Sequence, residues 1–204
     1  MSRAVDPIAE RFARETAQHE MTVLHDYGLY RHLRFRQPKQ GAYWFDIITW
    51  PGCLAIRGDV DGGYIFTRVP DMFEFFRSKS GRINADYWAE KTQGGRDACK
   101  SYTEEHFKAR VIEEIRYRDD RPAGLLLAIQ NEIFRDNIAV EAEARESLER
   151  FKHEGFRFYD VWEWDLRDFH WHYLWCCHAI VWGISQYDSK RAELVAAGAV
   201  ADHA

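Results

Sequence analysis

The stretch YWFDIITWPGCLAIRGD, residues 43–59, predicts two strands joined by a Pro-Gly turn, and so the beginning of an antiparallel sheet. Alternation along the first strand places Trp44, Asp46 and Trp50 on one face of this sheet. An unpaired carboxylate between two indoles would be costly to bury. Asp46 is therefore predicted to be either a hydrogen-bonded core acid or the floor of a binding site.

Further strands on both sides extend this hairpin into a meander. Residues 29–36 alternate between apolar and polar side chains, and residues 64–68 predict a strand after a glycine turn. Asp6-Pro7 predicts a helix start, and the apolar stripe that follows suggests a helix that ends at Gly28. Beyond Pro70 the pattern is mainly helical. Consecutive strands followed by helices predict an α+β fold with helices on a face and at the ends of one small sheet.

We expect a single α+β domain over residues 1–204, with a small antiparallel β-meander of about four to five strands and about five to six helices. Its parts are a β-meander at 29–68, a helical region at 71–154, a strand plus buried C-terminal helix at 156–187, and a frayed tail at 188–204. Residues 156–165 predict the last strand. The helix at 169–187 should place Trp175 and Trp182 in the core.

The charge of the chain excludes a general DNA-coating protein. The formal net charge is −5 with a pI near 6.0, whereas such a protein would be strongly basic. Residues 1–100 carry 15 Lys+Arg against 13 Asp+Glu, and residues 101–204 carry 13 against 20. Residues 30–39 hold four basic side chains and no acid. An anionic ligand is therefore expected to approach the first half of the chain.

The four cysteines are predicted to be buried thiols of a reducing compartment, because none lies in a pair spaced for zinc. The first residues lack an apolar segment, so we expect no signal peptide and a cytoplasmic protein. The stretch 169–184 is nearly long enough to cross a membrane, but three histidines argue for a buried core helix. We expect no cofactor and no membrane partner.

A polar face of the predicted sheet is the candidate anion site. Arginine forks suit phosphate and indoles can stack on bases. The alternative is a solvated edge strand that charge protects from aggregation. We also expect Asp46 to pair with Arg57 or Arg68 across the strands. The candidate ligand residues are Tyr30, His32, Arg34, Arg36, Trp44, Trp50, Arg57 and Arg68.

Three residues are candidates for acid–base chemistry: Asp46, Glu163 and His172. Glu163 lies in an acidic stretch that an amphipathic strand and a helix cap also explain. His172 lies near His170 and His178, and the three cannot share one metal ion on a helix. If a strand instead runs on through His172, His170 and His172 share a face and could begin a two-ligand site, but no metal site is assigned. Neither a P-loop nor a nucleophile elbow is present in the sequence.

Several blocks of the chain resemble a family of unassigned activity that is encoded mainly by tailed bacteriophages and prophages. These blocks are YWFD at 43–46, TWPG at 49–52, GD at 58–59, FTR at 66–68, DMFEFFR at 71–77, YWAEK at 87–91, LWCC at 174–177 and AIVWG at 179–183. The resemblance covers most of the chain and implies a phage origin. It carries over no catalytic residue.

Small phage proteins of this kind are often antagonists of host defence. We therefore expect a counter-defence protein that binds a nucleotide signal, or a nucleic-acid-associated defence effector in an anti-CRISPR-like manner, in the cytoplasm of the bacterial host. One alternative is a nucleotide hydrolase or phosphodiesterase. Another is a protein–protein inhibitor whose acidic half mimics nucleic acid. The partners considered are a nucleotide or nucleic-acid-related ligand, a host defence protein, and a second copy in a homo-oligomer.

Overall fold

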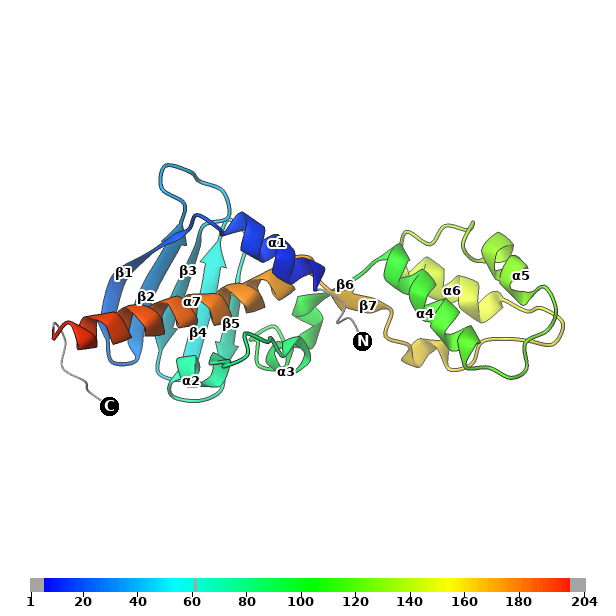
Figure 1. The fold of residues 1–204 in the computed structure, drawn as a ribbon. Coiled ribbons are helices and arrows are strands. Elements are labelled where there is room, and N and C mark those ends of the chain that lie inside the picture. The colour runs from blue at the N-terminus through cyan, green and yellow to red at the C-terminus, as the bar shows by residue number, and fades with distance from the viewer. Residues whose placement is uncertain (1–5, 61, 199–204) are drawn as a thin grey trace. The chain divides into compact units, whose positions relative to one another are not determined.

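The computed structural model describes residues 6–60 and 62–198. These residues form an α+β fold, as predicted, with a five-stranded antiparallel sheet, a two-stranded ribbon and seven α-helices (Figure 1). The elements are α1 (Pro7–Glu15), β1 (Glu20–Tyr27), β2 (Tyr30–Arg36), β3 (Phe45–Trp50), β4 (Cys53–Gly58), β5 (Tyr64–Thr67), α2 (Met72–Phe76), α3 (Ala85–Ala89), η1 (Arg96–Cys99), β6 (Lys100–Tyr102), α4 (Glu104–Arg116), α5 (Leu125–Glu132), α6 (Glu141–Arg150), η2 (Val161–Glu163), β7 (Arg167–Phe169) and α7 (Trp171–Ala196). They fall into two compact units: the first runs to Cys99 and resumes at His170, and the second is Lys100–Phe169.

The sheet of the first unit is a meander in the order β1-β2-β3-β4-β5. The four strands expected within residues 29–68 are confirmed as β2 to β5. The prediction of a helix up to Gly28 is wrong, because α1 ends at Glu15 and Glu20–Tyr27 forms β1. Gly28 has a φ of +59° and turns the chain into β2 instead of ending a helix. Pairing with β2 therefore overrides the local helical pattern.

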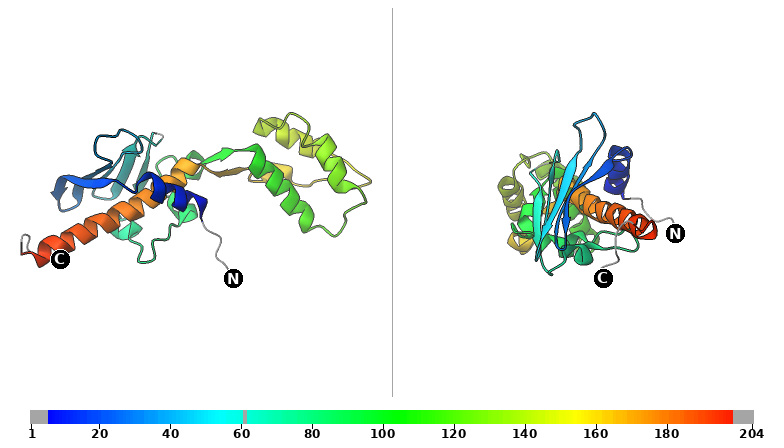
Figure 2. Two further views of the ribbon diagram at one scale, coloured as in Figure 1. Left: turned by 45° about the horizontal axis from the view of Figure 1, so that its top comes forward. Right: turned by 90° about the vertical axis from the view of Figure 1, so that its left-hand side faces the viewer.

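Helices α1 and α7 lie on the same face of this sheet (Figure 2, right). The apolar side of the strands, with Phe35 and Ile47 fully buried, packs against α7. A Cβ at Gly183 of α7 would lie 2.6 Å from Ile47 Cδ1 and 3.1 Å from Phe35 Cζ. Any side chain at this position would therefore force the Ile47 and Phe35 side chains to shift.

Helix α7 is longer than the sequence predicts. It begins at Trp171, after the N-cap residue His170, and continues to Ala196. The expected frayed tail at 188–204 is therefore wrong for residues 188–196, which are helical. Residues 199–204 lie outside the described residues. Trp175 is fully buried as expected, whereas Trp182 is only partly buried. In the part of the chain that the structure describes, no helix is long and apolar enough to span a bilayer.

The second unit packs α4, α5 and α6 around its own core, and β6 pairs with β7. The strand predicted at 156–165 is not formed: this segment contains η2 and irregular chain. Its apolar residues Phe156 and Phe158 are buried in the core, while Asp160 has a left-handed φ of 50° that interrupts any extended run. The alternation of apolar and polar residues in this segment therefore comes from a loop whose phenylalanines pack into the core, and not from a strand.

Candidate functional site

The face of the sheet opposite α7, here called the outer face, carries most of the predicted ligand residues. Since side chains alternate along a strand, burial of Leu33 and Phe35 on the helix side turns His32, Arg34 and Arg36 of β2 to the outer face. The register places Arg34 opposite Asp46 of β3, and Asp46 opposite Arg57 of β4. Three neighbouring strands thus bring one acid and several bases together.

Asp46 is the centre of this group, and its side chain is fully buried. Arg34 donates from Nε to Oδ1 at 2.8 Å and from Nη2 to Oδ2 at 2.9 Å. Arg57 Nε donates to Oδ2 at 3.3 Å, and His32 Nε2 lies 3.1 Å from the same oxygen. The expectation of a partner for Asp46 is met by Arg57, and also by Arg34, whose pairing the sequence did not predict.

The charge state of Asp46 follows from these contacts. Burial raises the pKa of its carboxyl, but the hydrogen bonds and charge of Arg34, with His32 close by, outweigh this effect, so the pKa lies below its ordinary value of 3.8. Asp46 is therefore an ionised acceptor that holds several donors. This arrangement suits a positioning acid better than a general base, because a lowered pKa makes it a weak proton acceptor.

Trp44 lies beside the two arginines that Asp46 holds. The Arg34 and Arg57 guanidinium carbons are 5.3 Å and 5.6 Å from its ring centroid, within the range of a cation–π contact. The Trp44 carbonyl accepts from the Asp59 N–H at 2.9 Å. A Cβ at Gly58 would lie only 2.1 Å from that carbonyl oxygen, so this close backbone contact requires glycine.

A cavity of about 260 Å³ opens next to Trp44. It is lined by Arg34 and Arg36 of β2, together with Gln40 and Gly41 of the loop that leads to β3. Sequence reasoning did not single out these two loop residues, because nothing in their types or spacing distinguishes them from an ordinary polar turn. The cavity combines two guanidiniums, one amide and one indole.

The remaining ligand candidates lie away from this cavity. Tyr30 is 52% exposed at the start of β2, opposite Tyr27. Trp50 pairs with Cys53 at the other end of β3. Arg68 follows β5, where its N–H donates to the Gly52 carbonyl at 3.3 Å. The structure therefore groups His32, Arg34, Arg36, Trp44 and Arg57 and separates Tyr30, Trp50 and Arg68 from them.

The three acid–base candidates are not brought together in the first unit. Asp46 belongs to the outer face, whereas His172 is on α7, which covers the opposite face. Glu163 is an exposed residue of η2 in the second unit. Within residues 6–60 and 62–198, no group of three or more His, Cys, Asp or Glu residues could hold a metal ion.

Comparison of the chain with protein-family models, curated proteins and solved structures finds no match. Function is therefore inferred from side-chain chemistry. On the outer face, Asp46 organises Arg34 and Arg57 around Trp44. Such an arrangement can bind an anion that also carries a planar ring.

Proposed function

We propose that the outer face binds a nucleotide or a nucleic-acid-related ligand, and that the protein acts as a phage-type counter-defence factor. The observation that carries the binding proposal is the pair of guanidiniums that one buried carboxylate fixes beside Trp44. The counter-defence setting is supported by the resemblance of the sequence blocks to the phage family. Sequestering a nucleotide signal would be its simplest form.

The arrangement supports binding because its arginines are already ordered. Asp46 holds Arg34 and Arg57 without a ligand, so less side-chain entropy is lost when a ligand binds. The Arg34 contacts to Asp46 use Nε and Nη2, and Nη1 has no hydrogen-bond partner among the described residues. This nitrogen and the exposed Arg36 would donate to a phosphate, while a base would stack on Trp44.

The net charge of the outer face and the volume of its cavity limit how many phosphates the ligand carries and how much of it the cavity can enclose. Asp46 offsets one of its two arginines, and Glu20 stands opposite Arg36 in the strand register, so the surplus of positive charge is small. The 260 Å³ cavity is below the usual range for a whole drug-sized molecule. A ligand with one or two phosphates would therefore place one group in the cavity and rest the remainder on the open face.

Calorimetry with the full chain tests this proposal. The ligands are a mononucleotide, a cyclic dinucleotide and a short single strand, each measured at two salt concentrations. Trp44→Leu and Arg36→Ala should each weaken binding, and Arg36→Ala should also reduce its salt dependence. Arg14→Ala, an exposed arginine on α1, is the matched control. The absence of binding to all three ligands, or equal affinities for Arg36→Ala and Arg14→Ala, would contradict the proposal.

A further inference from the structure

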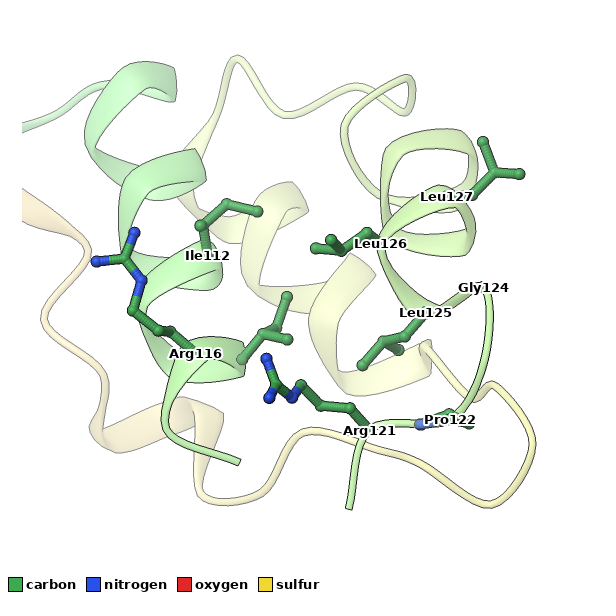
Figure 3. A pocket seen from close by; sticks show the side chains of 9 residues that line it. Ile112, Arg116, Arg121, Pro122, Gly124, Leu125, Leu126 and Leu127 are labelled. Carbon is green, nitrogen blue, oxygen red and sulfur yellow. The ribbon is translucent and has the colours of Figure 1, made fainter. Parts of the chain in front are cut away.

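The second unit has an apolar groove that its own core does not fill. A cavity of about 670 Å³ lies between α4 and α5, and Figure 3 shows Ile112 of α4 and Leu126 of α5 on its two sides. Ile115 and Leu125, which are 2% and 3% exposed, also line it. The groove therefore has buried apolar residues at its base and reaches the surface between two helices.

The apolar surface extends beyond the base of the groove. Leu126 is 55% exposed and Leu127 is 62% exposed, although both lie on a helix that packs into the unit. Adjacent exposed leucines beside an apolar cavity are typical of an interaction surface, whereas single exposed apolar residues are not. A partner of some length is needed to cover both leucines and fill the base of the groove.

Two arginines at this groove indicate the charge of the partner that would bind there. Arg116 and Arg121 both line the cavity, and neither has an ion pair or side-chain hydrogen bond among the described residues. The unit has 17 acidic residues and only 12 basic ones, so carboxylates are plentiful within it. Two other arginines of the unit form ion pairs: Arg110 Nη2 lies 3.4 Å from Glu114 Oε2, and Arg118 Nη2 lies 2.7 Å from Asp120 Oδ2. The two groove arginines are left for an external carboxylate.

We propose that this groove binds an acidic amphipathic helix of a partner protein. Apolar side chains spaced i, i+3 or i+4, and i+7 would enter between α4 and α5, as in other helix-in-groove complexes. Carboxylates beside this stripe would accept hydrogen bonds from Arg116 and Arg121. A small apolar anion would satisfy the guanidiniums but would leave much of the exposed leucine surface uncovered. This site is independent of the outer face of the sheet.

Reciprocal charge reversal on the full chain tests the proposal. The probes are labelled helical peptides with leucines at several such spacings, flanked by glutamates in one set and by lysines in a matched set. Binding is measured by fluorescence anisotropy. Wild type should prefer the acidic set, and Arg116→Glu with Arg121→Glu should weaken that binding about tenfold or more. The same double variant should gain affinity for the lysine set.

Two control variants make the result specific. Arg135→Glu reverses an exposed charge elsewhere in the same unit, and Val140→Asp changes a 52% exposed apolar residue at an N-cap position where aspartate is favourable. Both should bind the acidic peptides like wild type, whereas Leu126→Asp should not. Failure of every acidic peptide to bind, equal binding of both sets, or equal losses in the controls would overturn the proposal. So would a sedimentation result in which wild type self-associates and Leu126→Asp does not, because a second copy would then occupy the groove.

Discussion

Arg34 and Asp46 face each other on neighbouring strands, and the Arg34 guanidinium meets both oxygens of the Asp46 carboxylate at 2.8 and 2.9 Å. The carboxylate is fully buried, while the Arg34 side chain is 32% exposed. The acid is thus shielded by the residues that it binds. Such a pair is sensitive to loss of the acid, because the cations would keep their positions without a counter-charge.

Replacing this acid should destabilise the first unit. We expect Asp46→Asn to lower the free energy of unfolding by about 1–3 kcal/mol, because one acceptor oxygen and an amide would replace a carboxylate that serves several donors. Urea denaturation followed by circular dichroism measures the change. Asp97→Asn, at an exposed position of η1, is the control. An unchanged denaturation midpoint for Asp46→Asn would show that the arginines are held by other contacts.

Acid should remove the same stabilisation. The pKa of Asp46 in the folded chain lies below its ordinary value of 3.8, so the unfolded chain takes up the proton first as pH falls. The contribution is therefore complete above the ordinary pKa and is lost as pH falls through the folded value. Wild type should lose melting temperature more steeply below pH 3.8 than Asp46→Asn does. Parallel pH curves for the two proteins would be inconsistent with this linkage.

The contact of α7 with the sheet should make Gly183 intolerant of a side chain. Gly→Ala in a helix interior normally stabilises by roughly 0.5–1 kcal/mol. Here the new methyl would lie 2.6 Å from Ile47 Cδ1 and 3.1 Å from Phe35, so we expect a net loss of about 1–3 kcal/mol from overpacking. Thermal melting of Gly183→Ala beside Ser185→Ala, an exposed position on the same helix, separates packing from helix propensity. A Gly183→Ala variant more stable than wild type would mean that Ile47 and Phe35 can move aside with little loss of free energy.

Thiol reactivity should report on folding. Burial raises the pKa of the Cys99 and Cys177 thiols, and Cys176 is also buried, whereas Cys53 is partly exposed at the start of β4. We expect a thiol reagent to label Cys53 first in the native protein and the other three cysteines only after denaturation. Mass spectrometry identifies the modified residue, and Cys53→Ser should abolish the native reaction. Early labelling of Cys177 would reveal opening of α7.

The sheet was largely predictable because its signals are local. Strands β2 to β5 alternate clearly and are separated by turn residues, so their existence and order follow from the sequence. Strand β1 is different: it is an edge strand, and seven of its eight residues are exposed, so no buried face produces an alternating pattern. Val23, Leu24 and Tyr27 happen to fit a helical stripe instead. Only pairing with β2 decides between the two structures.

The candidate site was predictable in composition but not in pairing. The two-residue period of a strand already groups His32, Arg34 and Arg36 on one face. Their relation to Asp46 depends on how far β3 is shifted against β2, and the loop between them sets that shift. This loop contains Lys39 and Tyr43 in left-handed conformations, with φ values of 64° and 56°. No sequence pattern specifies such conformations at non-glycine residues.

The chain leaves the first unit at Cys99 and returns at His170, whose N–H donates a 2.9 Å hydrogen bond to the Cys99 carbonyl. The point where the chain leaves the first unit and the point where it returns are therefore joined by one backbone hydrogen bond. The segment between them, Lys100–Phe169, is therefore an insertion with adjacent ends. Recombination could remove or replace such an insertion without changing the path of the backbone in the first unit. A lineage with this layout can acquire a new target by swapping one internal stretch of its gene, and the rest of its coding sequence need not change.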